Sequence, residues 1–368
     1  MASRTTSPQK HRPCAIDLFS GCGGLSTGLE QAGFRVCAAV EIDDKAQRTY
    51  QLNHPGVKLY GNDIRKLSVR KVMRDLSLSA GELDLLAGCP PCQGFSRLRT
   101  LNQADSVDDP RNNLVRDFLR FVRVLRPKTV MLENVPALEN DERFTSLCEA
   151  LRAMKYKLVV HVLNAADYSV AQRRKRLILL ASKVHVPAIA PKSEQRKTVG
   201  DVIRHLEAPS VTRDALHAVP EKRSKQVMEL IRLIPRDGGS RTDLPADRQL
   251  ECHKRSDGFH DVYGRMAWND LAPTITSGCI NPSKGRFLHP IQDRTITLRE
   301  AALLQGFPPK YKFDVSHGKE AIALMIGNAL PPPFIEAQAR VLRDGILTGK
   351  RDEKNFNRGR ASRRGTDC

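Results

Sequence analysis

The sequence lacks the features that mark secreted and membrane proteins. Its nine cysteines show no disulfide-framework spacing, and no charged segment followed by an apolar stretch and a small-residue cleavage site opens the chain. No apolar run approaches the length that spans a membrane. We therefore expect a protein of the reducing cytoplasm with a sizeable core, formed by one large domain and a smaller inserted one.

Acidic residues are scarce relative to basic ones. The chain has 60 Lys and Arg against 41 Asp and Glu, with a formal net charge of +19. An excess of this size predicts a polyanionic partner, and the basic residues do not gather on one amphipathic helix, which favours nucleic acid over an anionic membrane. The alternative is that the charge only keeps the protein soluble.

Strand-like and helix-like segments alternate from residue 14 to about residue 181. The alternation predicts an α/β fold, with a doubly wound, mostly parallel sheet and helices on both faces. The expected strands lie near 14–19, 35–41, 57–60, 83–87, 128–132, 156–163 and 175–181. The expected helices lie near 25–32, 44–53, 65–76, 112–125 and 141–153.

The alternation breaks after residue 183, and Pro-rich and charge-rich stretches predict a smaller inserted domain over 184–293. A capping box of Thr297 and Glu300 then predicts a new helix start. We expect this helix, and others near 318–326 and 332–345, to pack back onto the sheet. The core domain would thus comprise residues 12–183 and 294–347, with disordered basic ends at 1–11 and 348–368.

Cys92 follows a short apolar run at 83–88. Pro90 and Pro91 exclude helix just before the thiol, and Gly94 lets the chain turn closely past whatever the sulfur attacks. These features indicate a nucleophile held at the end of a strand. The alternative is that Cys89 and Cys92 form half of a zinc site or a redox pair, but no second C-x-x-C completes a zinc site.

Glu133 follows a second strand-like run, at 129–132. Because parallel strands end on one edge of a sheet and ligands bind along that edge, Cys92 and Glu133 can face one substrate. An acid in this place is otherwise a helix cap or a solvated charge. Beside Cys92 it becomes a candidate acid catalyst.

A glycine-rich turn at 20–28 follows the first strand and would let the backbone approach a nucleotide closely. Glu41 ends the second strand and suits a pair of ribose hydroxyls, while Asp63 follows the third strand and could receive an adenine amine. A dinucleotide-binding oxidoreductase is the alternative. Ser26 stands where its third glycine would be, which favours an adenosyl cofactor instead.

Together these motifs resemble the C5-cytosine DNA methyltransferases of bacterial type. The resemblance covers residues 17–24, 90–96, 133–135, 172–176, 299–308 and 327–331. Two departures are small: the family often has Val where Leu330 stands, and Ile42 replaces an aromatic residue beside the acid of the second strand. The resemblance implies a Rossmann-like methyltransferase fold and S-adenosylmethionine as the methyl donor.

The chemistry of such an enzyme assigns a role to each motif. Cys92 would add to carbon 6 of a cytosine flipped out of the duplex, and Glu133 would donate a proton or hydrogen bond to nitrogen 3. Arg174 and Arg176, which alternate along a strand and so share a face, could hold the O2 carbonyl. The polar segment 97–109 is expected to close over the base. By resemblance, the cofactor residues would be Phe19, Gly21, Gly23, Gly24, Glu41, Asp63, Pro91, Leu114 and Asn328.

The segment 184–293 corresponds in position to the family's target recognition domain. Its candidate DNA contacts are Lys254, Arg255, Arg265, Thr276, Lys284 and Arg286. We therefore predict a DNA (cytosine-5-)-methyltransferase that acts on a short duplex sequence, with a tRNA cytosine-5 methyltransferase or a catalytically silent DNA-binding regulator as alternatives. We expect double-stranded DNA as the partner, no membrane and no metal. A cognate restriction or defence protein is a further candidate partner, and a monomer suffices for the reaction. The compact size suggests a bacterial or phage enzyme at the nucleoid.

Overall fold

The computed structural model describes residues 12–91, 114–219, 222–248 and 261–362. Several predictions fall outside these ranges, namely those for Cys92, the segment 97–109, Lys254, Arg255 and the N-terminal residues 1–11. No helix within the described ranges is both long and apolar enough to cross a membrane.

A seven-stranded sheet in the order β3-β2-β1-β4-β5-β7-β6 forms the centre of the fold. Its first five strands pair in parallel, and β7 pairs antiparallel with both β5 and β6. The strands are β1 (Cys14–Leu18), β2 (Arg35–Val40), β3 (Lys58–Tyr60), β4 (Leu85–Gly88), β5 (Thr129–Asn134), β6 (Lys157–Asn164) and β7 (Lys175–Ser182). Each predicted strand is confirmed, as is the mostly parallel sheet. The short connection between β6 and β7 is compatible only with an antiparallel pair, because a parallel crossover needs a dozen or more residues.

Helices cover both faces of the sheet. One buried cluster joins Ile16, Leu86 and Leu132 of the sheet to α3, α5 and α6, and another joins Ala15 and Met131 to α1 and α12. Successive strand residues therefore face opposite helix layers, as the two-residue period of a strand requires. The helices of the first part of the chain are α1 (Gly24–Gln31), α2 (Asp44–Asn53), α3 (Val69–Asp75), α5 (Leu114–Leu125) and α6 (Glu142–Ala153), with the turns η3 (Pro136–Asn140) and η4 (Ala165–Tyr168).

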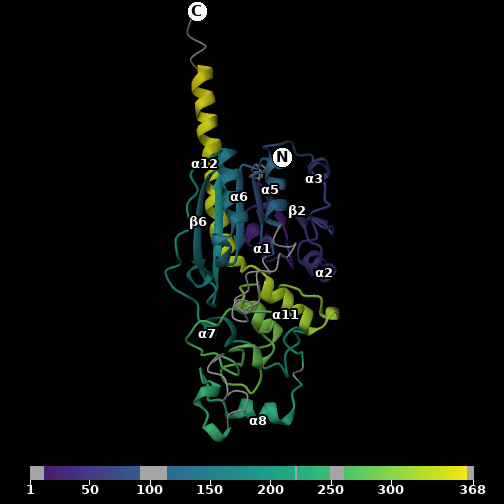
Figure 1. Ribbon diagram of the computed structural model, residues 1–368, viewed down its shortest axis with the longest axis vertical. Helices are drawn as coiled ribbons and strands as arrows, with labels where there is room; N and C mark the ends of the chain where they lie inside the picture. The colour runs from purple at the N-terminus through teal and green to yellow at the C-terminus, as the bar shows by residue number, and fades with distance from the viewer. Residues whose placement is uncertain (1–11, 92–113, 220–221, 249–260, 363–368) are drawn as a thin grey trace, which may run out of the picture.

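The middle of the chain forms short elements at one end of the sheet. Figure 1 shows α7 (Val199–Ile203) and α8 (Lys225–Leu233) there, on the side away from the C-terminal end of α12. The remaining elements are η5 (Arg241–Asp243), η6 (Ala246–Arg248), η7 (Pro282–Lys284), α10 (Leu298–Leu304), η8 (Val315–His317), α11 (Lys319–Asn328) and α12 (Pro332–Ser362). A cluster of buried apolar side chains joins α7, α10 and α11.

The predicted capping box at the start of α10 is present. The Thr297 hydroxyl accepts a hydrogen bond from the Glu300 amide at 3.2 Å, and the Glu300 carboxylate accepts one from the Thr297 amide at 2.7 Å. Of the last three helices, α12 packs on the sheet layer through α1. The helices α10 and α11 pack mainly with the middle segment.

Helix α12 also continues past its predicted end at 345. It runs to Ser362 and projects beyond the sheet (Figure 1). No proline follows Pro333 in this stretch, and therefore no residue lacks the amide that a continuing helix needs.

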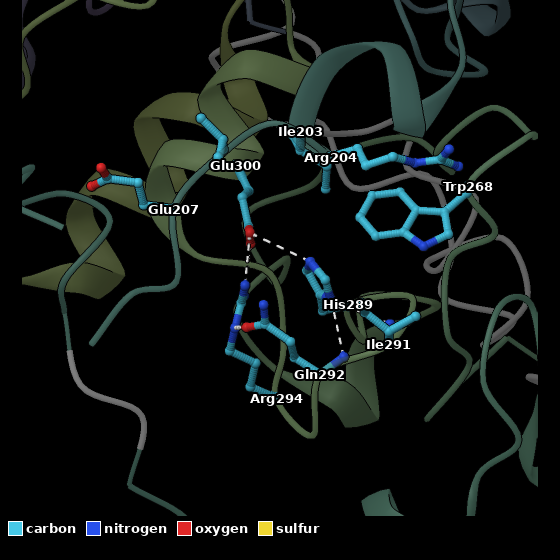
Figure 2. Close-up of a pocket in the computed structure, with 10 residues that line it drawn as sticks. Ile203, Arg204, Glu207, Trp268, His289, Ile291, Gln292, Arg294 and Glu300 are labelled. Carbon is cyan, nitrogen blue, oxygen red and sulfur yellow. Dashed lines mark hydrogen bonds and ion pairs between the residues drawn. The ribbon is translucent and has the colours of Figure 1, made fainter. Parts of the chain in front are cut away.

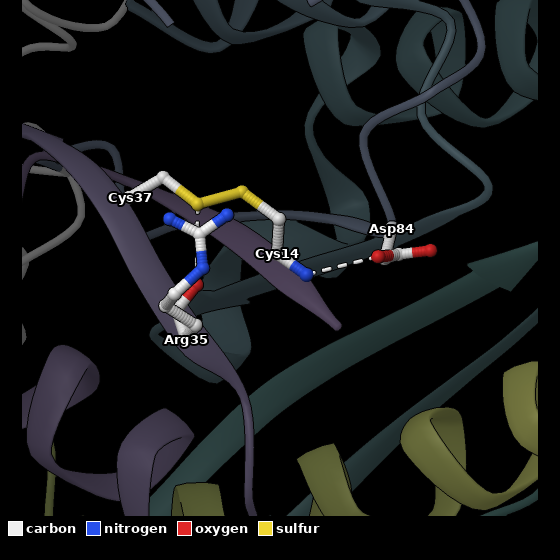
Figure 3. Close-up of a disulfide and its surroundings, with 4 residues drawn as sticks. All are labelled: Cys14, Arg35, Cys37 and Asp84. Carbon is white, nitrogen blue, oxygen red and sulfur yellow. Dashed lines mark hydrogen bonds between the residues drawn. A yellow bond between two sulfur atoms is a disulfide. The ribbon is translucent and has the colours of Figure 1, made fainter. Parts of the chain in front are cut away.

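Cys14 and Cys37 join β1 to β2 through a disulfide, with their Cα atoms 6.1 Å apart (Figure 3). The pairing register shifts between Ala15 and Ile16, which leaves Cys37 as a bulged residue without a partner on β1. The pair could not be read from sequence spacing, since the neighbouring strands bring the two residues together.

Close packing of α1 on α12 generates a prediction about Gly28. A Cβ atom at this position would lie 2.6 Å from the Pro332 carbonyl oxygen and 2.7 Å from the Ile335 Cβ. Alanine normally stabilises a helix interior, but here we expect Gly28→Ala to lower the free energy of unfolding by about 1–3 kcal/mol through overpacking. Urea denaturation would measure the change.

Gly56→Ala is the matched control for this substitution, because a Cβ there meets no atom within 4 Å. We expect its stability to match or slightly exceed that of the unsubstituted protein. Equal effects of the two substitutions would contradict the packing that we describe for α1 and α12.

Candidate active site

The ends of β4 and β5 lie side by side at the carboxyl edge of the sheet. Gly88, the last residue of β4, pairs with Leu132, directly before Glu133. The Asn134 side chain donates a hydrogen bond of 2.9 Å to the Pro90 carbonyl oxygen. The segment that leads to Cys92 is thus anchored to the strand that carries Glu133, although Cys92 itself is not among the described residues.

Glu133 is almost completely buried, with 1% of its surface exposed. Burial raises the pKa of its carboxyl group above the ordinary value, against the opposing effects of Arg176, Cys89 and Arg174. Its Oε2 accepts a hydrogen bond from the Cys89 thiol at 2.9 Å, and its Oε1 lies 3.0 Å from the Arg176 Nε. The ion pair lacks hydrogen-bond geometry, so Oε1 has no donor within the described part of the chain.

Arg174 is also buried, but its guanidinium group is bound to the backbone. It donates hydrogen bonds to the carbonyl oxygens of Ile275 (3.1 Å), Gly327 (3.1 Å) and Ala329 (3.2 Å). Burial lowers the pKa of Arg174 to about 9, and the group remains a cation at neutral pH. Both Arg174 and Arg176 lie close enough to Glu133 to lower its pKa. Arg176 is the ion-pair partner of Glu133, whereas Arg174 links three backbone carbonyls, a set of contacts that we call the Arg174 brace.

Two buried glutamines, Gln172 and Gln305, extend this network of hydrogen bonds, and neither was among the predicted site residues. The Gln172 amide donates to the Gln305 side-chain oxygen at 2.7 Å and to the Leu304 carbonyl at 3.1 Å, while its own oxygen accepts from the Ile275 amide at 2.9 Å. The Gln305 amide in turn donates to the Ala329 carbonyl. Both glutamines lie inside the motifs at 172–176 and 299–308, which was the available signal.

The glycine-rich turn after β1 is shaped by close contacts within the protein. A Cβ on Gly23, whose φ is +101°, would lie 2.5 Å from the Tyr311 hydroxyl, and one on Gly24 would lie 2.5 Å from the Leu330 carbonyl oxygen. Gly21 also has a positive φ, of 55°, but a Cβ there would meet nothing within 4 Å. Its neighbour Phe19 adopts a φ of 63°. The turn is therefore packed on one side and open at Gly21.

Glu41 joins this turn to the end of β2. Its carboxylate accepts hydrogen bonds from the amides of Gly21 (2.7 Å), Ile42 (2.9 Å) and Asp43 (2.8 Å), although burial raises its pKa overall. Asp63 follows β3 and forms a 2.6 Å ion pair with Arg65, whose hydrogen bonds hold the pKa of that carboxyl below its usual value. The other predicted cofactor residues occupy three environments: Leu114 is buried, Pro91 is half-buried and Asn328 is exposed.

The surroundings of Gly21 can accept an adenosyl group. The Ser20 hydroxyl is buried without a hydrogen-bond partner among the described residues, and the Ile42 side chain, next to Glu41, is 60% exposed. A polar group, an apolar side chain and open backbone thus meet at the ends of β1 and β2. No group of three or more His, Cys, Asp or Glu side chains suited to a metal ion occurs in the described ranges.

The predicted DNA contacts divide into buried and exposed residues. Arg265 is fully buried, and its guanidinium group donates to the carbonyls of Ile231, Ile234, His289 and Gln292 and to Asp293. It cannot reach DNA, which corrects that prediction. Arg286 likewise directs one guanidinium nitrogen to three backbone carbonyls and pairs with Asp261, whereas Thr276 and Lys284 are exposed.

A separate cavity of about 390 Å³ lies beside α7 (Figure 2). Its wall includes Trp268, which stacks under the Arg204 guanidinium at 4.9 Å and meets the His289 ring edge-on at 5.3 Å. Arg294 donates two hydrogen bonds, of 2.7 and 2.8 Å, to Glu300, and burial lowers the pKa of His289 to about 4. These polar groups lining the cavity are thus in contact with one another, and none of them belongs to the candidate active site.

Comparison with known proteins agrees with this arrangement. Residues 14–344 match the sequence profile of the C-5 cytosine-specific DNA methylases. The chain belongs to this family. It is 34% identical over 331 residues to the Type II methylase M.HgiDII of Herpetosiphon aurantiacus, covering 86% of this chain and 91% of that protein. It is 32% identical over 335 residues to the Type II methyltransferase M1.HphI of Haemophilus parahaemolyticus, covering 89% of this chain and 86% of that protein.

A solved structure supports the same conclusion for the fold. A protein of E. coli, described as a DNA modification methyltransferase encoded within a prophage, superposes with a TM-score of 0.70 at 25% identity, covering 91% of this chain and 99% of that one. As a member of the C-5 cytosine-specific DNA methylase family, this chain is a methyltransferase. The family and the similar structure confirm the predicted resemblance and the Rossmann-like α/β fold with its mostly parallel sheet.

The brace around Arg174 generates a prediction about stability. Lysine cannot reproduce the planar fork that reaches three carbonyls, and those carbonyls would lose their donors. We expect Arg174→Lys to lower the free energy of unfolding by about 2 kcal/mol, as measured by urea denaturation.

The neighbouring Arg173 provides the control, because its ion pair with Asp270 is about half exposed. We expect Arg173→Lys to change stability by about 0.5 kcal/mol or less. If Arg174→Lys proves as mild as the control, Arg174 does not brace the structure.

Proposed function

We propose that this chain is a DNA (cytosine-5-)-methyltransferase that transfers a methyl group from S-adenosylmethionine to carbon 5 of a cytosine in a short duplex sequence. One observation supports it most: Glu133, a buried acid paired with Arg176, lies one residue before the end of β5, and β5 pairs with β4, the strand that leads to Cys92. Family membership and the fold supply the reaction class.

The cofactor would bind at the carboxyl ends of β1 to β3. Glu41 would receive its ribose hydroxyls, Asp63 its adenine amine, and Ile42 would pack against the adenine ring. Phe19 and the open backbone at Gly21 would face the amino acid part, with Pro91, Leu114 and Asn328 completing the site. When bound, S-adenosylmethionine supplies an electrophilic methyl group. The protein would then have to hold the methyl group next to carbon 5 of the cytosine ring.

Addition of a thiolate to carbon 6 makes carbon 5 nucleophilic, and Cys92 would provide that thiolate. As the C6–S bond forms, negative charge moves toward nitrogen 3 and O2. Glu133, whose pKa burial raises, can donate a proton at nitrogen 3, while the Arg176 guanidinium stabilises the charge on O2. After methylation the C5 proton leaves to a base, the C6–S bond breaks and nitrogen 3 returns its proton to Glu133, which restores the aromatic ring. The cytosine must leave the base stack for this reaction.

The region 184–293 would read the DNA sequence. Exposed Thr276 and Lys284 are the remaining candidates for contact, and Thr276 follows Ile275, which both Arg174 and Gln172 hold. A tRNA methyltransferase would not need this additional surface.

The proposal predicts methyl transfer from labelled S-adenosylmethionine to duplex DNA and none to tRNA. Sequencing of 5-methylcytosine in the product DNA would identify the recognised sequence. We expect Cys92→Ala to abolish transfer and Glu133→Gln to lower kcat by about 100-fold. Cys148→Ala, which alters a buried cysteine of α6, should retain activity.

Transfer to tRNA alone would favour the alternative substrate. Full activity of Cys92→Ala would rule out the covalent mechanism. Binding of DNA without transfer by the unsubstituted protein would favour a silent regulator.

A further inference from the structure

Cys89 is a second thiol at the candidate active site, and the mechanism above gives it no task. It directly follows β4, and its Sγ donates a hydrogen bond of 2.9 Å to the Glu133 Oε2. We propose that Cys89 is a positioning residue that fixes the orientation of the Glu133 carboxyl group, leaving Oε1 for the substrate ring. This inference rests on the proposed function.

The direction of this hydrogen bond follows from the charges around the sulfur. Removal from water and the negative charge of Glu133 raise the pKa of Cys89 well above its ordinary value, despite the opposing charges of Arg176 and Arg174. Cys89 is therefore a neutral thiol at physiological pH. The S–H group is therefore the donor, and Oε2 can accept it whether or not the other oxygen of Glu133 carries a proton.

The two oxygens of Glu133 thus have different partners. Oε2 accepts from the thiol, whereas Oε1 lies beside the Arg176 cation and receives no hydrogen bond within the described part of the chain. The last torsion of a glutamate side chain is broad and roughly two-fold. An ion pair alone would let the carboxyl group turn, and the thiol removes that freedom by holding one oxygen.

Orientation matters because a proton donor must meet nitrogen 3 in the plane of the cytosine ring. A carboxyl group free to turn would be correctly placed for only part of the time, and this lowers kcat more than it lowers substrate binding. Donation by Cys89 also stabilises the carboxylate and lowers the pKa of Glu133. Removing the donor should therefore raise that pKa further.

Infrared spectroscopy tests the contact without requiring activity. The S–H stretching band of Cys89 is isolated as the difference between the unsubstituted protein and Cys89→Ser. We expect this band at the lowered frequency of a hydrogen-bonded thiol, and we expect it to move to higher frequency in Glu133→Gln. An unchanged band in Glu133→Gln would overturn the inference.

Methylation kinetics test the consequence. We expect Cys89→Ala to lower kcat about tenfold, with KM for DNA and for S-adenosylmethionine changed less than about twofold. Cys89→Ser keeps a donor and should restore most of kcat. In Cys89→Ala the limb of the pH profile that reports loss of the Glu133 proton should move to higher pH.

Cys148→Ala is the matched control, since it removes a buried thiol from α6, outside the candidate site. If Cys89→Ala keeps the kcat and pH profile of this control, or if Cys89→Ser is as impaired as Cys89→Ala, Cys89 only fills space. Inactivity of the unsubstituted protein on DNA would instead refute the proposed function, while the infrared result would still decide the contact. Thermal unfolding of each variant shows whether it is folded.

Discussion

The ion pair between Glu133 and Arg176 is the interaction on which the account of this site depends. A carboxyl group with 1% of its surface exposed loses most of its hydration, and an unpaired charge there would cost several kcal/mol. The parallel pairing of β4 with β5 fixes the position of the acid, and β7 brings the arginine from the other side of β5. The sheet thus creates an acid with a raised pKa at the edge where substrates bind.

A second set of buried polar contacts joins distant parts of the chain around that acid. Arg174, Gln172 and Gln305 connect the start of β7 with the loop at Ile275 and with the end of α11. A Cβ on Gly327 would lie 2.3 Å from the Ser277 amide nitrogen, so the loop and the helix end are in direct backbone contact. The exposed Thr276 is therefore positioned by the same contacts that surround the candidate catalytic groups.

The strands and most helices could be predicted from the sequence because each is a local pattern of apolar residues bounded by turn residues. The edge on which Glu133 and Glu41 lie also followed, since parallel strands share their carboxyl ends. Arg265 shows the limit of such reasoning. Arginine is seldom buried, and only the fold reveals that four carbonyls and Asp293 surround this one.

The roles of Arg174 and the two glutamines depended on tertiary contacts in the same way. Apart from the Ala329 carbonyl, which lies 24 residues from Gln305, their side-chain partners are more than 100 residues away along the chain, and no local period encodes them. The Cys14–Cys37 pair and the packing of α10 with α7 likewise arise from the meeting of separate segments. The predicted helix ends at 345 because the residues beyond it supply few core positions, whereas α12 continues to Ser362.

The central claim is that Cys92 forms a temporary bond with carbon 6 of a cytosine while Glu133 acts on nitrogen 3. Duplex DNA with 5-fluorocytosine in the recognised sequence tests it most directly, because fluorine at carbon 5 prevents release of the enzyme after methyl transfer. With S-adenosylmethionine present, the account predicts a protein–DNA complex that survives a denaturing gel, with the bond located on Cys92 by mass spectrometry. Methylation of normal DNA at that sequence without any such complex would contradict it.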